Sequence, residues 1–154
     1  MQLEKPLGYL LGQTMRIFRN KLIEKFRQHD IDLTFDLVVI LFEVRDNENM
    51  TQQDLSEIIH KDKSAILRQV NTLLDKRYLV RLPDKSDKRK KNLILTHKGY
   101  QMLAQAKAIG LALSNELLEG VSDEEFLTFF RVLTKIRKNS EKEESAKLVD
   151  KNNH

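Results

Sequence analysis

The chain has 154 residues and a formal net charge of +4, and it contains few glycines and prolines and no cysteine. This length fits one domain with a hydrophobic core, and the low content of glycine and proline favours helices. The lack of cysteine excludes disulfides, thiolate metal sites and thiol-based redox switches. The longest fully apolar run, residues 37–42, is too short to cross a bilayer, so we expect a soluble cytoplasmic protein.

The first part of the chain is predicted to form two helices. From Pro6 to about His29, apolar residues recur at spacings of three and four, which is typical of a long amphipathic helix. Thr34 is a suitable N-cap for a second helix. The nearly continuous apolar run at residues 35–44 would by itself also fit a buried strand, but its length and its helical neighbours favour a central helix.

A short two-helix unit follows. Thr51 is a good N-cap and Asp54 places negative charge in the first turn, so a helix begins here. His60 and Lys61 form the turn, and Asp62 caps the second helix. At 100° per residue, the apolar residues of this second helix share one side. The opposite side is polar and carries Ser64, Arg68, Asn71, Thr72 and Asp75.

A strongly basic β-hairpin is predicted directly after this unit, at residues 78–95. Between Arg81 and Lys91, six cations and two anions give six minus two, or +4, which equals the charge of the whole chain. The cations are Arg81, Lys85, Lys88, Arg89, Lys90 and Lys91, and the anions are Asp84 and Asp87. A concentrated basic projection beside a two-helix unit is suited to neutralising the phosphates of duplex DNA.

Two more helices are predicted in the last third of the chain. Thr96 can cap a long helix, and Ser122 with Glu125 forms a capping box for another. The last helix has an apolar stripe at residues 126–136, which we interpret as core that continues into a subunit interface. From Lys138 on, the chain is polar with nearly balanced charge, and we expect residues 147–154 to be a disordered tail.

This layout resembles the MarR family of bacterial transcription regulators over nearly the whole chain. The two-helix unit at residues 54–81 looks like the DNA-binding elements of that family. The hairpin at residues 84–99 looks like the family's wing, because it has an Asp-x-Arg motif at Asp87 and Arg89 and closes with Leu-Thr at Thr96. The spacing, charge and terminal threonine together make the wing the more specific part of the resemblance.

The resemblance implies a mainly α fold and a homodimer. We expect a single domain at residues 1–146, in which a winged helix-turn-helix DNA-binding lobe occupies about 34–97 and carries a two-stranded wing. Long N- and C-terminal helices, at about 6–29 and 97–140, would be the dimerisation arms, because amphipathic helices of this length cannot all be buried on one small globule.

The turn between the two short helices departs from the family pattern. That turn usually has glycine followed by an aliphatic residue, whereas this chain has His60 and Lys61. The turn must therefore adopt a different backbone or hold a residue with a Cβ at positive φ. Lys61 also adds a cation beside the second helix.

We expect DNA contacts from three groups of side chains. In the recognition helix and its turn they are Lys61, Lys63, Ser64, Arg68, Asn71 and Thr72; at the start of the preceding helix, Thr51 and Gln52; and in the wing, Lys85, Asp87, Lys88, Arg89, Lys90 and Lys91. A polar helix face is more often merely solvated, but its place before a basic hairpin favours DNA. Arg68 can pair with guanine and Asn71 with adenine. Arg89 is expected to enter a minor groove, with Asp87 orienting the wing.

The predicted function is that of a sequence-specific transcription regulator, a repressor that binds a pseudo-palindromic operator on double-stranded DNA as a homodimer. The resemblance implies release by a small effector, often aromatic or anionic, bound between the DNA-binding lobe and the arms. The alternative is a winged-helix module that binds another protein, against which the basic wing argues. We expect no enzyme activity, cofactor or metal site, because no catalytic constellation stands out and the four histidines share no metal-ligand spacing.

Overall fold

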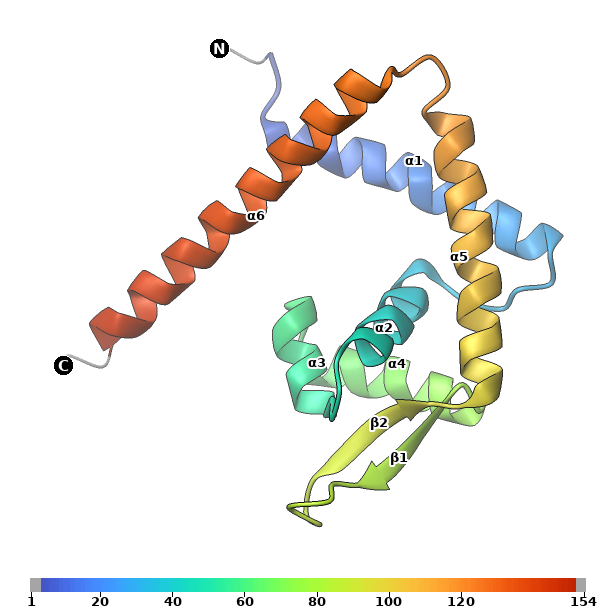
Figure 1. The fold of residues 1–154 in the computed structure, drawn as a ribbon, viewed down its shortest axis with the longest axis vertical. Helices are drawn as coiled ribbons and strands as arrows, with labels where there is room; N and C mark the ends of the chain where they lie inside the picture. Colours follow the sequence, from blue (N-terminus) through green and yellow to red (C-terminus); the bar gives the residue numbers. More distant parts are fainter. Residues whose placement is uncertain (1–3, 152–154) are drawn as a thin grey trace. The chain divides into compact units, whose positions relative to one another are not determined.

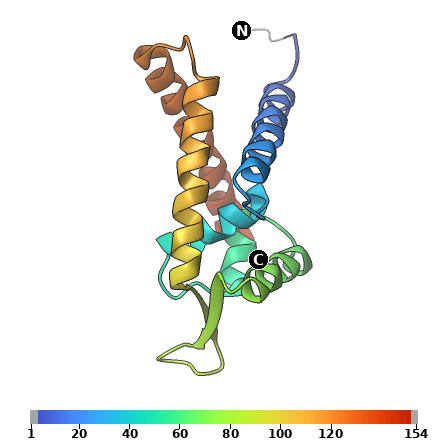
Figure 2. The ribbon, with the colours of Figure 1, turned by 90° about the vertical axis from the view of Figure 1, so that its right-hand side faces the viewer.

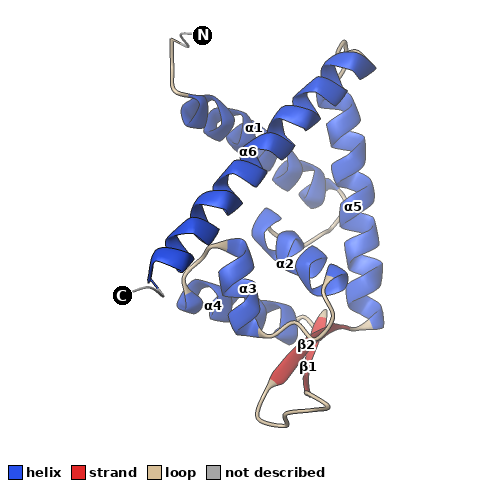
Figure 3. Cartoon of the chain, turned by 60° about the vertical axis from the view of Figure 1, so that its left-hand side comes forward, coloured by secondary structure: helices blue, strands red, loops and turns tan. Residues whose placement is uncertain are grey.

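The computed structural model describes residues 4–151, with side chains described for residues 4–140. The chain divides into two compact units, one ending at Ser114 and one beginning at Asn115. Most of it is helical, with one two-stranded antiparallel sheet, as predicted (Figure 1 and, coloured by element type, Figure 3). The order of elements is α1 (Leu7–Gln28), α2 (Phe35–Asp46), α3 (Gln52–Ile59), α4 (Lys63–Asp75), β1 (Leu79–Pro83), β2 (Lys91–Leu95), α5 (His97–Leu117) and α6 (Asp123–Lys151).

The core of the first unit is built around α2. Ile40 and Leu41 of this helix are completely buried, and α2 contacts α1, α4 and β2. Leu55 of α3 and Ile66 and Leu73 of α4 are also completely buried. Each such side chain stabilises the fold by about 1.5–3 kcal/mol through removal of apolar surface from water. The segment that would also have fitted a buried strand is therefore a central helix, covered on several sides.

The caps predicted for α3 and α4 are present. Thr51 Oγ1 accepts a hydrogen bond from the Asp54 N–H at 3.2 Å, and the Asp54 carboxylate accepts one from the Thr51 N–H at 2.8 Å, which completes a capping box. The same threonine lowers the pKa of Asp54 below its ordinary value. Asp62 Oδ1 caps α4 by accepting from the Ala65 N–H at 2.8 Å. In the turn, His60 has φ 53° and ψ 43°, so a residue with a Cβ does occupy the left-handed region.

The hairpin is anchored to α5 at its base, which consists of Arg77, Tyr78, Thr96 and Gly99. The Thr96 hydroxyl donates to the Arg77 carbonyl oxygen at 2.7 Å and accepts from the Gly99 N–H at 2.9 Å. A Cβ placed on Gly99 would lie 2.1 Å from the carbonyl oxygen of Tyr78, so only glycine allows this approach. The strands pair from Leu79 with Leu95 outward, and Figure 2 shows the hairpin projecting beyond the helices of the first unit.

The long helices extend as follows. α5 runs through Gly110 without a break, and α6 begins with the predicted capping box, in which the Glu125 carboxylate accepts from the Ser122 N–H at 2.8 Å. α6 continues to Lys151, past residue 146, where the domain was predicted to end. Residues 147–151 read Lys, Leu, Val, Asp and Lys, of which lysine and leucine favour helix and valine and aspartate do so less. Residues 152–154 of the expected tail lie outside the described residues.

Candidate nucleic-acid interface

The recognition helix α4 presents an exposed face opposite its buried side. Ser64, Arg68 and Asn71 are exposed on this face, and Lys63 is exposed beside them in the first turn. Thr72 lies at its edge, is half-buried and donates from Oγ1 to the Arg68 carbonyl oxygen at 3.0 Å. The Ser64 hydroxyl donates to Asp62 Oδ1 at 2.5 Å, which is the main cause of the lowered pKa of Asp62. The hydroxyl hydrogens of this face are thus used within the helix, whereas the Arg68 guanidinium is directed to solvent.

Leu67 is a surface residue of this face that sequence reasoning missed. Its side chain is 42% exposed, three residues after Ser64 and four before Asn71. The helical spacing from Ser64 was the signal that could have found it. The C5-methyl group of thymine is the apolar group that the major groove offers, so an exposed leucine among polar readers is able to contact thymine.

Lys61 does not extend freely from the turn. Its Nζ lies 2.9 Å from Asp36 Oδ2, and Arg19 of α1 donates to Asp36 Oδ1 at 2.8 Å. The Arg19 guanidinium also lies over the ring of Phe35, 4.9 Å from its centroid. Asp36 therefore joins α1, α2 and the turn before the recognition helix, and part of the Lys61 charge is compensated within the protein.

Arg81 of β1 connects the two short helices with the wing. Its Nη2 donates to Gln52 Oε1 of α3 at 2.9 Å and to Asn71 Oδ1 of α4 at 3.2 Å. The structure thus brings two of the expected DNA-contacting residues, Gln52 and Asn71, onto one guanidinium. The sequence pattern offered no signal for this contact, because Arg81 lies 29 residues from Gln52.

Asp84 organises the loop of the wing. Its Oδ1 accepts from the Ser86 N–H at 2.8 Å, the Ser86 hydroxyl at 2.6 Å and the Asp87 N–H at 3.0 Å, and its Oδ2 accepts from the amide of buried Asn92 at 2.8 Å. These bonds, those from the Ser86 and Asn92 side chains first, hold the pKa of Asp84 far below its usual range. The Asp-x-Ser spacing of an Asx-type turn was the available signal, but the sequence analysis counted Asp84 only as an anion.

The tip of the wing presents Arg89. Asp87 Oδ1 accepts from the Arg89 N–H at 3.1 Å and from Arg89 Nε at 3.2 Å, and this interaction lowers the pKa of Asp87. The Arg89 side chain is nevertheless 93% exposed. Asp87 therefore orients the arginine without burying it. The other cations of the wing, Lys85, Lys88, Lys90 and Lys91, are exposed around it.

A polar hollow lies between the start of α3 and the wing. Its volume is about 770 Å³, and Thr51, Gln52, Lys90 and Lys91 are among the residues that line it. Thr51 also forms an isolated β-bridge with Asn92, which fixes the start of α3 against β2. Two carboxylates, those of Asp54 and Asp84, line it as well, so the charge of the two lysines is offset there.

Comparison with known proteins identifies the family of this arrangement. A sequence model of the MarR family matches residues 33–91, and an uncharacterized HTH-type transcriptional regulator of Bacillus cereus is 30% identical over 126 residues, which cover 81% of this chain and 83% of that protein. The chain belongs to the MarR family. The uncharacterized HTH-type transcriptional regulator YybA of Bacillus subtilis is 29% identical over 114 residues, 74% of this chain and 76% of that protein.

A solved structure agrees with this assignment. A mutant of MarR from E. coli, complexed with operator DNA, superposes with a TM-score of 0.74 and 26% identity over 85% of this chain and 93% of that chain. The predicted winged helix-turn-helix of the MarR family is thereby confirmed. In the described part of the chain, no three His, Cys, Asp or Glu side chains are grouped to hold a metal ion, and no helix is long and apolar enough to span a membrane.

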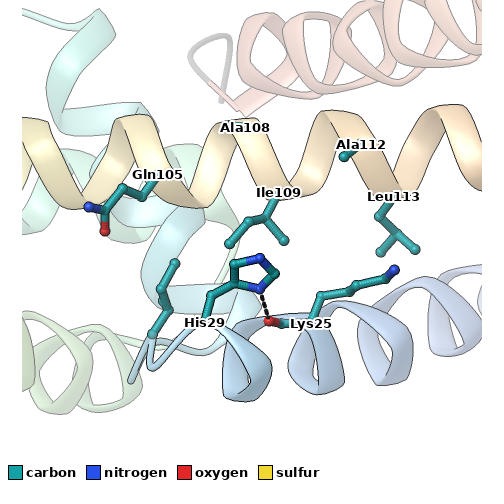
Figure 4. Close-up of a pocket in the computed structure, with 8 residues that line it drawn as sticks. Lys25, His29, Gln105, Ala108, Ile109, Ala112 and Leu113 are labelled. Atoms are coloured by element: carbon teal, nitrogen blue, oxygen red, sulfur yellow. Dashed lines mark hydrogen bonds between the residues drawn. The ribbon is translucent and has the colours of Figure 1, made fainter.

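Two cavities in this MarR-family chain lie between α1 and α5. The larger, of about 570 Å³, has Lys25 and His29 from the end of α1 on one side and Ile109 of α5 on the other (Figure 4). His29 Nδ1 lies 2.8 Å from the Lys25 carbonyl oxygen. The smaller, of about 330 Å³, is almost wholly apolar, with Phe18 and Phe42 in its lining. Their positions suit a small ligand that is apolar, or apolar with an anionic group at one end.

Proposed function

We propose that this protein is a sequence-specific DNA-binding regulator that inserts α4 into a major groove and Arg89 into the adjacent minor groove. The observation that carries the proposal is the exposed face of α4 beside a wing whose tip arginine is oriented by Asp87 yet remains 93% exposed. Membership of the MarR family and the likeness to a MarR mutant complexed with operator DNA support it.

Selection of bound fragments from random duplex DNA tests this proposal against the alternative of a protein-binding module. A DNA reader yields a consensus site, and its affinity falls steeply with salt, because each phosphate contact releases condensed counterions. Arg68→Ala is expected to weaken binding to that site by about 1–3 kcal/mol and to relax the preference at one position of each half-site. A selection that yields no consensus, or salt-independent binding, contradicts the proposal.

We infer that the DNA-binding species is a homodimer. Large apolar side chains remain exposed on the helices nearest the chain ends, among them Leu7 and Ile17 of α1 and Phe126, Phe129 and Phe130 of α6. Burial of such stripes against a second copy is the ordinary arrangement for helical dimers. Two recognition helices then meet half-sites about 10 base pairs apart, or roughly 34 Å. Sedimentation should show a dimer at micromolar concentration and a monomer for Phe130→Glu; a wild-type monomer contradicts the two-half-site proposal.

We further propose that the protein is a repressor released by a small effector in the cavity lined by Lys25, His29 and Ile109. The Lys25 ammonium and the His29 ring N–H at one edge, with the apolar wall, suit a small aromatic carboxylate. Benzoate at millimolar concentration is a suitable probe, expected to weaken operator binding by the wild type. Ile109→Trp, which fills the cavity, should retain operator binding but lose the response; an equal response in both proteins would place the effector elsewhere.

A further inference from the structure

We propose that Arg81 determines base preference by holding the amide oxygens of Asn71 and Gln52, so that both side chains present N–H donors to DNA. This inference rests on the proposed function, because it concerns how the same DNA interface reads sequence. It makes Arg81 a positioning residue, one that acts through Asn71 and Gln52.

The chemistry of the guanidinium settles which amide atoms face Arg81. A guanidinium group has five N–H donors and no acceptor, so each amide must turn its oxygen towards it. The same Nη2 atom reaches Gln52 Oε1 at 2.9 Å and Asn71 Oδ1 at 3.2 Å. Both of its hydrogens are therefore used, and the amide nitrogens of Gln52 and Asn71 point away from Arg81.

This arrangement changes the base that suits Asn71. Pairing with adenine requires the amide to accept from N6 and donate to N7, whereas guanine offers two acceptors, O6 and N7, and thymine offers one, O4. Asn71 Oδ1 keeps a second lone pair, but because this oxygen is turned towards Arg81, the amide cannot set its oxygen and nitrogen side by side against one adenine edge, and the exposed Asn71 presents its N–H donors. The adenine pairing expected from the sequence is therefore replaced by a preference for guanine or thymine.

The contact also restricts motion before DNA binds. Gln52, Asn71 and Arg81 belong to α3, α4 and β1, three elements of one compact unit. A free amide side chain can turn over and match either kind of base edge, and ordering it on binding costs entropy. Because Arg81 holds the amides of Gln52 and Asn71 in one orientation, their N–H donors are already in place before DNA binds. These donors disfavour adenine and cytosine, whose edges present an N–H of their own.

The test is a comparison of base preferences in parallel selections from random duplexes, using the full-length wild type, Arg81→Met and Arg81→Lys. At the position read by Asn71, the wild type should select guanine or thymine. Arg81→Met releases Oδ1, so the ratio of affinity for adenine to that for guanine should rise about fivefold or more. Arg81→Lys keeps the positive charge and a donor, and it should retain most of the wild-type preference.

Asn71→Asp supplies a second readout that does not depend on removing Arg81. Its carboxylate still accepts from Arg81 but has no N–H, so the preference for guanine or thymine should disappear at that one position and persist elsewhere. Circular dichroism confirms that each variant is folded, which is expected because Arg81 and Asn71 are exposed.

The outcomes of these selections distinguish a failure of the proposed DNA-binding function from a failure of the role proposed for Arg81. A wild type that selects no consensus contradicts the proposed function itself. A wild-type consensus that is unchanged in Arg81→Met, with uniformly weaker binding and a shallower salt dependence, makes Arg81 a phosphate contact and overturns the inference. Retention of the wild-type base preference by Asn71→Asp overturns it as well.

Discussion

Replacing Arg89 by alanine should nearly abolish operator binding while the fold and the dimer remain intact. The side chain is 93% exposed and hydrogen-bonded to Asp87 within its own turn. An exposed pair of this kind contributes at most about 1 kcal/mol to stability, so unfolding should hardly change.

The effect on DNA binding should be much larger, because the guanidinium is presented to solvent and ready to enter a groove. A charge-assisted hydrogen bond contributes about 1.5–3 kcal/mol, and loosening the contact with Asp87 offsets part of this gain. A net of about 1–2 kcal/mol per wing is lost from both wings of a dimer. The combined loss of about 2–4 kcal/mol corresponds to roughly 30-fold to 1000-fold weaker binding.

Fluorescence anisotropy with the selected operator at about 0.15 M salt measures this loss. Arg89→Lys should rescue only part of it, because an ammonium cannot copy the planar fork of donors. Lys91→Ala is the matched control for loss of one wing cation, with a milder defect and a shallower salt dependence. Wild-type binding by Arg89→Ala, or a defect no larger than that of Lys91→Ala, would contradict insertion of Arg89 into a groove.

Three other features have measurable consequences. If Leu67 contacts a thymine methyl group, replacing that thymine by deoxyuridine removes the methyl and should weaken wild-type binding about fourfold per half-site, at about 0.8 kcal/mol per buried carbon. The same replacement should not change binding by Leu67→Ala. Equal sensitivity in both proteins would exclude the contact. Gly99→Ala should lower the free energy of unfolding in urea by about 1–3 kcal/mol, because its Cβ meets a backbone oxygen at 2.1 Å. Gly110→Ala, in the same helix with nothing within 4 Å of its Cβ, should instead raise it by about 0.5–1 kcal/mol; a similar change in both would mean that the close approach is unimportant. Because the folded-state pKa of Asp84 is lowered, its stabilising effect is complete above pH about 4 and is lost as the pH falls through the folded pKa. The difference in unfolding free energy between wild type and Asp84→Asn should therefore shrink on acidification below pH 4, and a constant difference would contradict the role given to this carboxylate.

Local patterns were sufficient to predict most of the elements and the caps at which helices begin. The caps at Thr51, Asp62 and Thr96 and the exposed arginine of the wing all depend on residues within a few positions of one another. Such short-range signals arise from backbone geometry and charge, which a sequence displays directly. α6 extends past the predicted domain end at residue 146, and the polar, charge-balanced pattern after Lys138 carries no signal for its last turns.

Contacts between distant segments could not be predicted in the same way. Asp36 meets Lys61 across 25 positions (61 minus 36), and Arg81 meets Gln52 across 29. Each pair depends on how α2, α3 and the wing pack, and periodicity carries no information about that packing. For this reason the DNA contact predicted for Lys61 did not take its ion pair with Asp36 into account. The adenine pairing predicted for Asn71 likewise did not take the hydrogen bond from Arg81 into account.

Because the base of the hairpin is anchored to α5, a small rotation at the base produces a larger displacement at the tip of the wing. Hydrogen bonds through Thr96 and the close approach of Gly99 to Tyr78 prevent the first turn of α5 from rotating without the strands. The strands are five residues long, or about 17 Å, so a rotation of about 10° at the base displaces the tip by about 3 Å. That is about the length of one hydrogen bond. Under the proposed function, an effector that separates α1 from α5 by a small angle would withdraw the tip of the wing, and Arg89 with it, by this distance.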